Sequence, residues 1–179
     1  MEEIPQLYMR HPDLSKLPAL EIPQGCIIKT HTDDMVSKWE DIIFRAFDTP
    51  FKFEQCIING RTVGGYKPEH VMYLMEGEKV LATATAAERD DYPGEGWFRM
   101  IASDPEVRGK GLGKLICLAA LHSLKERGYN SAVLSTDDNR IPALKTYLSL
   151  GFEPIYFHES HEDRWKNVIE KINNFRKNA

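Results

Sequence analysis

The stretch that most constrains the fold is residues 108–114, Arg-Gly-Lys-Gly-Leu-Gly-Lys, which joins an extended apolar segment to a long apolar segment with helical periodicity. Its three glycines leave the backbone N–H groups unhindered by side chains. Where a helix starts directly after such a loop, these N–H groups lie at the positive end of the helix dipole and bind phosphate well. The stretch therefore predicts a strand, a phosphate-binding loop and a helix, in that order.

Two common phosphate-binding motifs do not fit this loop. The P-loop of nucleoside triphosphatases needs Gly where Arg108 stands and Ser or Thr where Leu115 stands. The dinucleotide fingerprint needs Gly or Ala in its last position, which Lys114 or Ile116 occupies in the two frames. The sequence thus argues against both nucleotide-binding classes.

The pattern that fits is Arg-x-x-Gly-x-Gly at Arg108, Gly111 and Gly113, preceded by a strand-like segment over residues 97–103. This pattern resembles the acetyl-CoA pyrophosphate loop of the GNAT superfamily of N-acetyltransferases. A glycine-rich hexapeptide alone is more often just a turn, so the assignment depends on what stands on either side of it.

A second block, Asn139-x-x-x-Ala143-x-x-x-Tyr147-x-x-x-Gly151-Phe152, follows the loop in the expected order. It resembles the motif after the fifth strand of the same superfamily, and a helix-like segment separates the two blocks. The resemblance implies an α/β chain with the GNAT fold. In that fold a mixed, mostly antiparallel central sheet is splayed at the fourth strand and flanked by helices.

The rest of the chain is organised around these blocks. Residues 1–25 carry four prolines and few periodic apolar positions, which predicts an irregular N-terminal arm, and residues 26–179 are predicted to form a single GNAT domain. Periodicity and turn residues predict strands over residues 26–30, 71–75, 79–85, 97–103, 131–135 and 153–158. Helices are predicted over residues 33–47, 51–58, 112–127 and 141–150. Glycines at positions 60, 64 and 65 predict a mobile loop.

The C-terminal segment departs from the resemblance. Trp165, Val168, Ile169, Ile172 and Phe175 recur at helical spacing, so an extra amphipathic helix is predicted where a GNAT domain usually ends with a pairing strand. This departure leaves the edge-strand pairing, the oligomeric state and the acceptor side open.

Composition narrows the class of protein. The net charge is −4 and the pI about 5.9, so nothing indicates a nucleic-acid partner. The first residues are acidic and no run of about 20 apolar residues is present, so we expect a cytoplasmic protein without a membrane partner. Cys26, Cys56 and Cys117 are widely spaced, which favours free thiols in or near the core over disulfides or a metal site.

The resemblance implies how acetyl-CoA, the acetyl donor, is held. The loop amides grip the pyrophosphate, and three basic side chains add positive charge unless they are simply solvated. The strand before the loop pairs through its backbone with the pantetheine arm, and Asn139 bonds the pantetheine amides unless it caps the following helix. The predicted donor-binding residues are Ile101, Ala102, Ser103, Arg108, Gly109, Lys110, Gly111, Leu112, Gly113, Lys114 and Asn139.

Tyr147 and Glu95 are the predicted catalytic residues. By the matched spacing Tyr147 points into the cleft, and a phenol with a pKa near 10 suits protonation of a departing thiolate. A half-buried structural aromatic is the alternative reading. Glu95 precedes Arg108 by thirteen residues, the offset of the catalytic Glu in histone-acetyltransferase-type members. A water relay is the alternative to this base.

Acidic and imidazole side chains elsewhere offer weaker signals. Glu88, Asp90 and Asp91 form a cluster that would attract a cationic acceptor, although a solvated acidic loop explains them equally well. His158 and His161 are candidate cleft residues for which surface positions are favoured.

Together these features predict an acetyl-CoA-dependent N-acetyltransferase, an acyltransferase of the EC 2.3.1 type. It would acetylate a primary amine of a small molecule or peptide by direct transfer in a ternary complex, because no Cys or Ser in the motif region has a neighbouring base. The patch Leu7–Arg10 resembles the segment leading into mycothiol-synthase-like acetyltransferase domains. A homodimer and a longer acyl donor stay open. The alternative function is a non-catalytic acyl-CoA-binding sensor or interaction module with the same fold.

Overall fold

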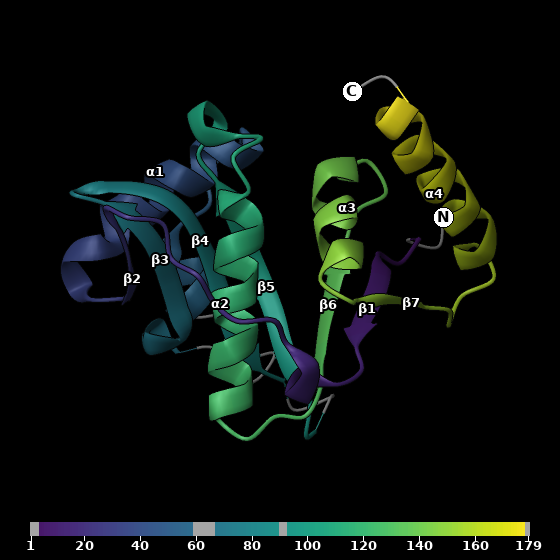
Figure 1. Ribbon diagram of the computed structural model, residues 1–179, viewed down its shortest axis with the longest axis horizontal. Helices are drawn as coiled ribbons and strands as arrows, with labels where there is room; N and C mark the ends of the chain where they lie inside the picture. Colours follow the sequence, from purple (N-terminus) through teal and green to yellow (C-terminus); the bar gives the residue numbers. More distant parts are fainter. Residues whose placement is uncertain (1–3, 59–66, 90–92, 178–179) are drawn as a thin grey trace.

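The sheet of the computed structural model has seven strands and carries helices on both faces (Figure 1). The structure describes residues 4–58, 67–89 and 93–177. The strands are β1 (Leu7–His11), β2 (Cys26–Thr30), β3 (Val71–Glu76), β4 (Lys79–Glu88), β5 (Gly96–Ser103), β6 (Ala132–Thr136) and β7 (Glu153–Ile155). The helices are α1 (Val36–Phe47), α2 (Leu112–Glu126), α3 (Ile141–Ser149) and α4 (His161–Lys177).

The strand order is β2-β3-β4-β5-β6-β1-β7. Among the described strands β5 and β6 run parallel, and the other neighbours pair antiparallel. The β3–β4 hairpin turns at Gly77, whose φ of 56° favours a residue without a Cβ. The predicted mixed, mostly antiparallel sheet is therefore confirmed.

The sheet opens between β5 and β6. These strands pair only over Gly96–Phe98 and Ala132–Leu134, and beyond that point they diverge. On its other side β5 carries a bulge, because the register steps from Thr85↔Arg99 to Thr83↔Ala102 and so gives β5 one extra residue. Within the bulge Met100 has a φ of 49°. The predicted splay at the fourth strand counted from Cys26 is confirmed.

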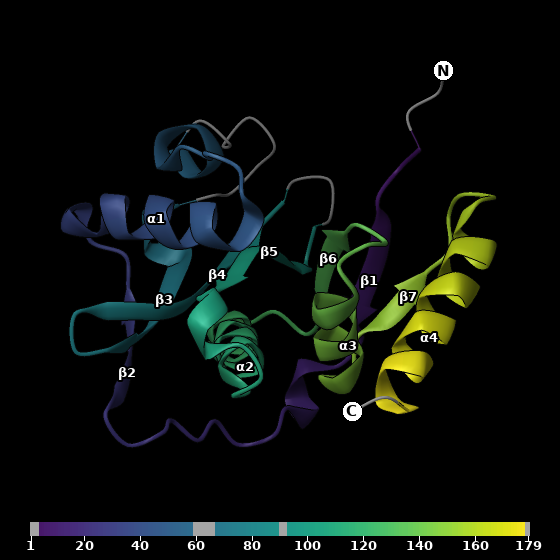
Figure 2. The same ribbon diagram turned by 90° about the horizontal axis from the view of Figure 1, so that it is seen from above.

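The two faces of the sheet are covered by different helices (Figure 2). α1 and a π-helical turn, Glu54–Ile58, pack on one face around Trp39 and Ile43, which are fully buried. α2, α3 and α4 lie on the other face. The predicted apolar circumference of α2 appears as an unbroken buried run from Ile116 to Leu121. The predicted short helix after Phe51 and the extra C-terminal helix are both present.

The N-terminal segment is the main correction to the sequence prediction. Residues 7–11 are not irregular but form β1, which lies between β6 and β7 and pairs antiparallel with both. Leu7 and Met9 are fully buried on one face, while Tyr8 and Arg10 point to the other. This alternation of period two was visible in the sequence, but the surrounding prolines hid it. β1 supplies the pairing strand that the C-terminal helix α4 had left missing.

Some predictions fall outside the described part of the chain or shift at their edges. The glycine loop at positions 60, 64 and 65 lies outside the described residues. The strand predicted over 153–158 ends at Ile155, after which Tyr156 and Phe157 are exposed. Among the described strands β7 pairs with β1 alone, so β7 is one edge of the sheet and β2 is the other.

Candidate functional site

A pocket of about 900 Å³ lies at the C-terminal ends of β5 and β6, where these strands have diverged. Both sequence blocks contribute to its walls. Of the predicted donor-binding and catalytic residues, the pocket is lined by Ile101, Ala102, Ser103, Arg108, Gly109, Gly111, Leu112, Gly113, Lys114, Asn139 and Tyr147. Lys110 is exposed on the same loop and is not part of the lining, and Glu95 is not either.

The glycine loop exposes the start of α2 to this pocket. Gly109 and Gly111 have φ values of 82° and 76°, which residues with a Cβ rarely adopt. The bond from Leu115 N–H to the Gly111 carbonyl, 3.0 Å, begins the helical ladder, so the N–H groups of residues 112–114 precede it. The 15-residue helix directs the positive end of its dipole to the same place.

Gly113 also allows a close approach between the helix and β5. A Cβ added at Gly113 would lie 2.6 Å from Ser103 Oγ, well inside van der Waals contact. The absence of a side chain at this position therefore keeps the end of β5 against the first turn of α2. Exposed Arg108 and Lys114 flank the opening, and Lys114 Nζ donates to the Ser149 carbonyl over 3.4 Å.

The buried carboxylate of Asp104 stabilises the turn that leads into the glycine loop, a role that the sequence analysis did not predict. Asp104 is 0% exposed, and its Oδ1 accepts from the Glu106 N–H at 2.9 Å and from Arg45 Nη2 at 2.5 Å. Lys79 Nζ lies 3.1 Å from the other oxygen. Burial alone raises the pKa of Asp104, but the hydrogen bonds from Glu106, Lys79 and Arg45 outweigh it and lower the pKa below the ordinary value. The carboxylate thus stays ionised and fixes the turn that leads into the loop.

Tyr147 lies on α3 with only 5% of its surface exposed. Its ring contacts Phe98 and Phe152 with centroid distances of 6.4 and 5.9 Å, which holds it across the divergence of β5 and β6. Burial raises the pKa of the phenol further above its usual range, so the hydroxyl keeps its proton at neutral pH.

A second pocket, of about 310 Å³, adjoins the first at Tyr147. The two pockets share five lining residues from four segments: Phe47, Ile101, Asp137, Arg140 and Tyr147. The rest of the second pocket is formed by the side chains of Gln6, Tyr8, Phe51, Arg89, Trp97, Phe98, Arg99, Met100, Ser135 and Thr136. Apart from Tyr147 and Ile101, the sequence motifs pointed to none of these residues.

The predicted base Glu95 is not among the lining residues of either pocket. It precedes the first residue of β5, roughly 20 Å of extended chain from Ile101 at the other end. Its two oxygens accept from Arg10 Nε at 2.9 Å and Arg10 Nη2 at 2.7 Å, a two-point ion pair between β5 and β1. Its assignment as a base stays a prediction that this geometry does not favour.

Glu88 is the one member of the predicted acidic cluster that the structure describes, and it does not line the second pocket. Glu88 faces Arg127 at 3.7 Å and His70 at 3.9 Å. Asp90 and Asp91 lie outside the described residues. Of the two histidines expected at the surface, His161 is fully buried, so that prediction is wrong for His161.

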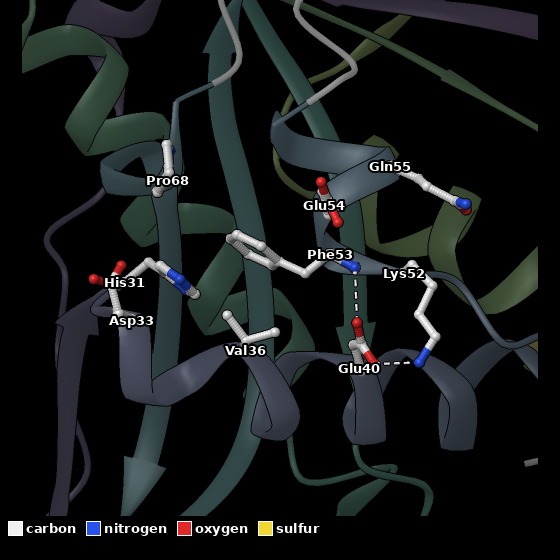
Figure 3. Close-up of a pocket in the computed structure, with 9 residues that line it drawn as sticks. All are labelled: His31, Asp33, Val36, Glu40, Lys52, Phe53, Glu54, Gln55 and Pro68. Carbon is white, nitrogen blue, oxygen red and sulfur yellow. Dashed lines mark hydrogen bonds and ion pairs between the residues drawn. The ribbon is translucent and has the colours of Figure 1, made fainter.

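A third pocket, of about 340 Å³, lies between α1 and the π-helical turn (Figure 3). Its polar groups are engaged with one another: Glu40 accepts from the Phe53 N–H at 3.1 Å and from Lys52 Nζ at 2.8 Å. The His31 ring stacks on Phe53 at 4.1 Å. These contacts anchor the segment that begins at Phe51, and Phe51 in turn lines the second pocket.

Other features of the described chain bear on the remaining expectations. Cys26, Cys56 and Cys117 are free, as predicted, and burial raises the pKa of the Cys117 thiol. Within the described ranges no three His, Cys, Asp or Glu side chains gather into a group that could hold a metal ion. No helix in the described part of the chain is both long and apolar enough to cross a membrane.

Two curated relatives of the chain are named mycothiol acetyltransferase. The mycothiol acetyltransferase of Nocardia farcinica is 39% identical over 158 residues, which are 79% of this chain and 50% of that protein. The mycothiol acetyltransferase of Rhodococcus erythropolis is 26% identical over 82% of this chain and 53% of its own length. The chain thus spans about half the length of the curated relatives it matches.

Solved structures share the fold. A GCN5-related N-acetyltransferase from Sphaerobacter thermophilus superposes with a TM-score of 0.67 at 21% identity, over 85% of this chain and 50% of that one. A GNAT acetyltransferase from Colwellia psychrerythraea gives 0.66 at 17% identity, over 85% and 53%. The model of the acetyltransferase (GNAT) family matches residues 29–152, more than half of the sequence, and the chain therefore belongs to the GNAT acetyltransferase family.

Proposed function

We propose that this protein transfers an acetyl group from acetyl-CoA to a primary amine by direct attack in a ternary complex. The observation that carries the proposal is the position of Tyr147, whose side chain lines both the 900 Å³ pocket and the 310 Å³ pocket. One pocket then holds the donor and the other the acceptor, with a proton donor where they meet. Family membership and the names of the relatives support an acetyl donor.

The larger pocket suits a phosphate-bearing donor. Backbone N–H groups at the start of α2 and the cationic side chains of Arg108 and Lys114 are what a pyrophosphate needs. The absent side chain of Gly111, where nothing lies within 4 Å of a Cβ position, leaves room for the phosphates to reach the backbone. Beyond the point where β6 diverges, the backbone of residues 101–103 is available for pairing with the pantetheine amides.

Tyr147 and water account for each proton that moves in the proposed acetyl transfer. The ammonium of the acceptor first loses a proton to water. The nitrogen of the resulting neutral amine then attacks the thioester carbonyl carbon, so a C–N bond forms as the C–S bond breaks. Tyr147 gives its hydroxyl proton to the departing sulfur, and the proton lost by the nitrogen passes to water in the open pocket and restores the phenol. Glu95 is the alternative acceptor of that proton, although its ion pair with Arg10 argues for water.

The test is thiol release from acetyl-CoA in the presence of a panel of amines, amino sugars, amino acids and peptides, with calorimetry of acetyl-CoA binding alongside it. The proposal expects binding of acetyl-CoA and amine-dependent release of CoA with formation of an N-acetyl product. Binding without release for every amine would instead favour the non-catalytic acyl-CoA sensor.

A further inference from the structure

The proposed acceptor pocket is rich in positive charge, although the expected acceptor is a cationic amine. Its described lining contains three guanidinium groups, those of Arg89, Arg99 and Arg140. Asp137 supplies the one carboxylate in the described part of that lining. An amine acceptor enters as a cation, so three arginines beside its path need a reason.

Two of these arginines are fixed by stacking on aromatic walls. The guanidinium carbon of Arg89 lies 4.0 Å from the centre of the Trp97 ring, and that of Arg140 lies 4.2 Å from the centre of the Phe47 ring. Arg140 Nε also donates to Asp137 Oδ2 at 3.2 Å. Stacking engages the face of a guanidinium and leaves the N–H groups on its edge directed outward.

The strand geometry brings Arg99 to the same side of the sheet. Trp97 and Arg99 are two apart on β5, ahead of the bulge at Met100, so their side chains share one face. Their partners across the ladder are Ala87 and Thr85. Arg89 follows directly after the end of β4 at Glu88, and its guanidinium lies over the Trp97 ring. Arg89 and Arg99 therefore flank Trp97 in one wall of the pocket.

Each of these side chains can hold an anion even where it already has a neighbour. A guanidinium carries five N–H donors and no acceptor, and one partner uses only part of them. Because the pocket is small and walled by aromatic rings, a charge-assisted hydrogen bond formed inside it is stronger than one in open solvent.

Resting on the proposed function, we infer that the acceptor carries an anionic group, a carboxylate or a phosphate, in addition to its amine. Arg99 and Arg140, with Arg89 stacked on Trp97, bind this group and direct the amine to the thioester beside Tyr147. The donor phosphates bind on the other side of Tyr147, at the start of α2.

The experiment compares matched acceptors at saturating acetyl-CoA. L-Phenylalanine is set against L-phenylalaninamide, and glucosamine 6-phosphate against glucosamine, so that the two pairs also separate a carboxylate from a phosphate. In at least one pair we expect kcat/KM to be about tenfold or more higher for the anionic member, as charge-assisted bonds imply. This advantage should shrink as KCl is raised.

Arginine variants then locate the effect. Arg99→Gln and Arg140→Gln should each reduce the advantage to about threefold or less, because each removes a guanidinium that binds the anionic group. The readout is the ratio of kcat/KM between the anionic and the neutral member, measured for each variant at saturating acetyl-CoA. Arg140→Lys keeps the charge and should retain part of the advantage. Arg10→Gln is the matched control, because Arg10 lines neither pocket. Melting temperatures identify a variant that fails to fold, in which case the other carries the test.

The outcomes are distinct. Equal or better use of the neutral members, or an advantage that survives both glutamine variants, overturns the inference and leaves the acetyltransferase function intact. A weakened Kd of acetyl-CoA without a change in acceptor preference also overturns it, because the arginines would then serve the donor. Failure of acetyl-CoA to bind the wild-type protein would remove the proposed function itself, and the inference with it.

Discussion

The two pockets that meet at Tyr147 are built in opposite ways. The larger one is built around the glycine loop, the start of α2 and the end of β5, where glycines at fixed spacing expose the backbone. The smaller one presents side chains, among them Gln6, Arg89 and Arg140, that come from segments far apart in the chain. The larger pocket depends on one local sequence motif, whereas the smaller pocket forms only once the strands have paired into the sheet.

The family match covers the described lining of the larger pocket entirely and that of the smaller pocket except for Gln6 and Tyr8. The matched residues 29–152 include the whole loop, the start of α2 and Tyr147. They exclude β1, which brings Gln6 and Tyr8 to the smaller pocket.

The largest expected effect is on the residue common to both pockets. Tyr147→Phe should lower kcat about 100-fold, because the thiolate loses its proton donor. The Kd of acetyl-CoA should stay within about twofold, since the ring packing on Phe98 and Phe152 remains. Thiol-release kinetics and calorimetry measure the two quantities, with Tyr156→Phe at an exposed position as the control. An unchanged kcat would show that Tyr147 lines both pockets without donating a proton to the thiolate.

The next effect concerns the support under the donor pocket. Asp104→Asn should lower the free energy of unfolding by about 2 kcal/mol, because it leaves Arg45 and Lys79 facing a neutral group at a buried site. Chemical denaturation measures this change. Asp34→Asn is the control, since Asp34 lies on the surface and bonds only its neighbour Thr32 among the contacts described.

The same carboxylate gives a pH dependence. Its folded-state pKa lies below the ordinary value, so its stabilisation is fully present above the unfolded pKa and is lost as the pH falls through the folded pKa. Wild-type stability should therefore decline below about pH 4. Asp104→Asn should decline less steeply over that range. If the stability of both proteins fell equally steeply with pH in this acid range, the ionised Asp104 side chain would contribute nothing specific to the donor pocket.

A smaller effect tests the backbone character of the donor pocket. Gly113→Ala should raise the Kd of acetyl-CoA about tenfold, because the added Cβ meets Ser103 Oγ and displaces the end of β5 from α2. Combining it with Ser103→Ala should restore most of the affinity, since that change removes the clashing oxygen. Ser103→Ala alone should bind normally. If it does not, the Ser103 side chain takes part in donor binding.

The smallest expected effect separates pairing from catalysis at Glu95. Glu95→Gln and Arg10→Gln break the same exposed ion pair, so each should change stability by less than about 1 kcal/mol and kcat by less than about twofold. A fall in kcat of about 100-fold in Glu95→Gln, with Arg10→Gln unaffected, would instead establish Glu95 as the base.

The sequence was informative wherever chemistry depends on local backbone geometry. Glycines at 109, 111 and 113 and the spacing to Tyr147 predicted the strand, loop and helix and the pocket they form. The splay followed from the resemblance, and the bulge that places Met100 at positive φ has no signal in its side chain. Arg89, Arg99 and Arg140 could not be predicted as one wall, because strand register and α3 bring them together.

The N-terminal strand taught a related lesson. Four residues of alternating pattern are too few to outweigh four prolines, so Leu7–Arg10 looked irregular until β6 and β7 provided partners on both sides. The tertiary context decided its conformation rather than local propensity.

The position of β1 also affects the order in which the strands of the sheet pair during folding. β1 leaves the ribosome before the other described strands, yet its neighbours β6 and β7 are made last, and the hydrogen bond from Gln6 to Asp137 spans 131 positions. Contacts so distant in sequence form late and slow the folding of the whole chain. Until β1 returns, β6 and β7 each present an open edge to other molecules. The smaller pocket, which Gln6 and Tyr8 help to line, is therefore complete only once β1 has joined the sheet.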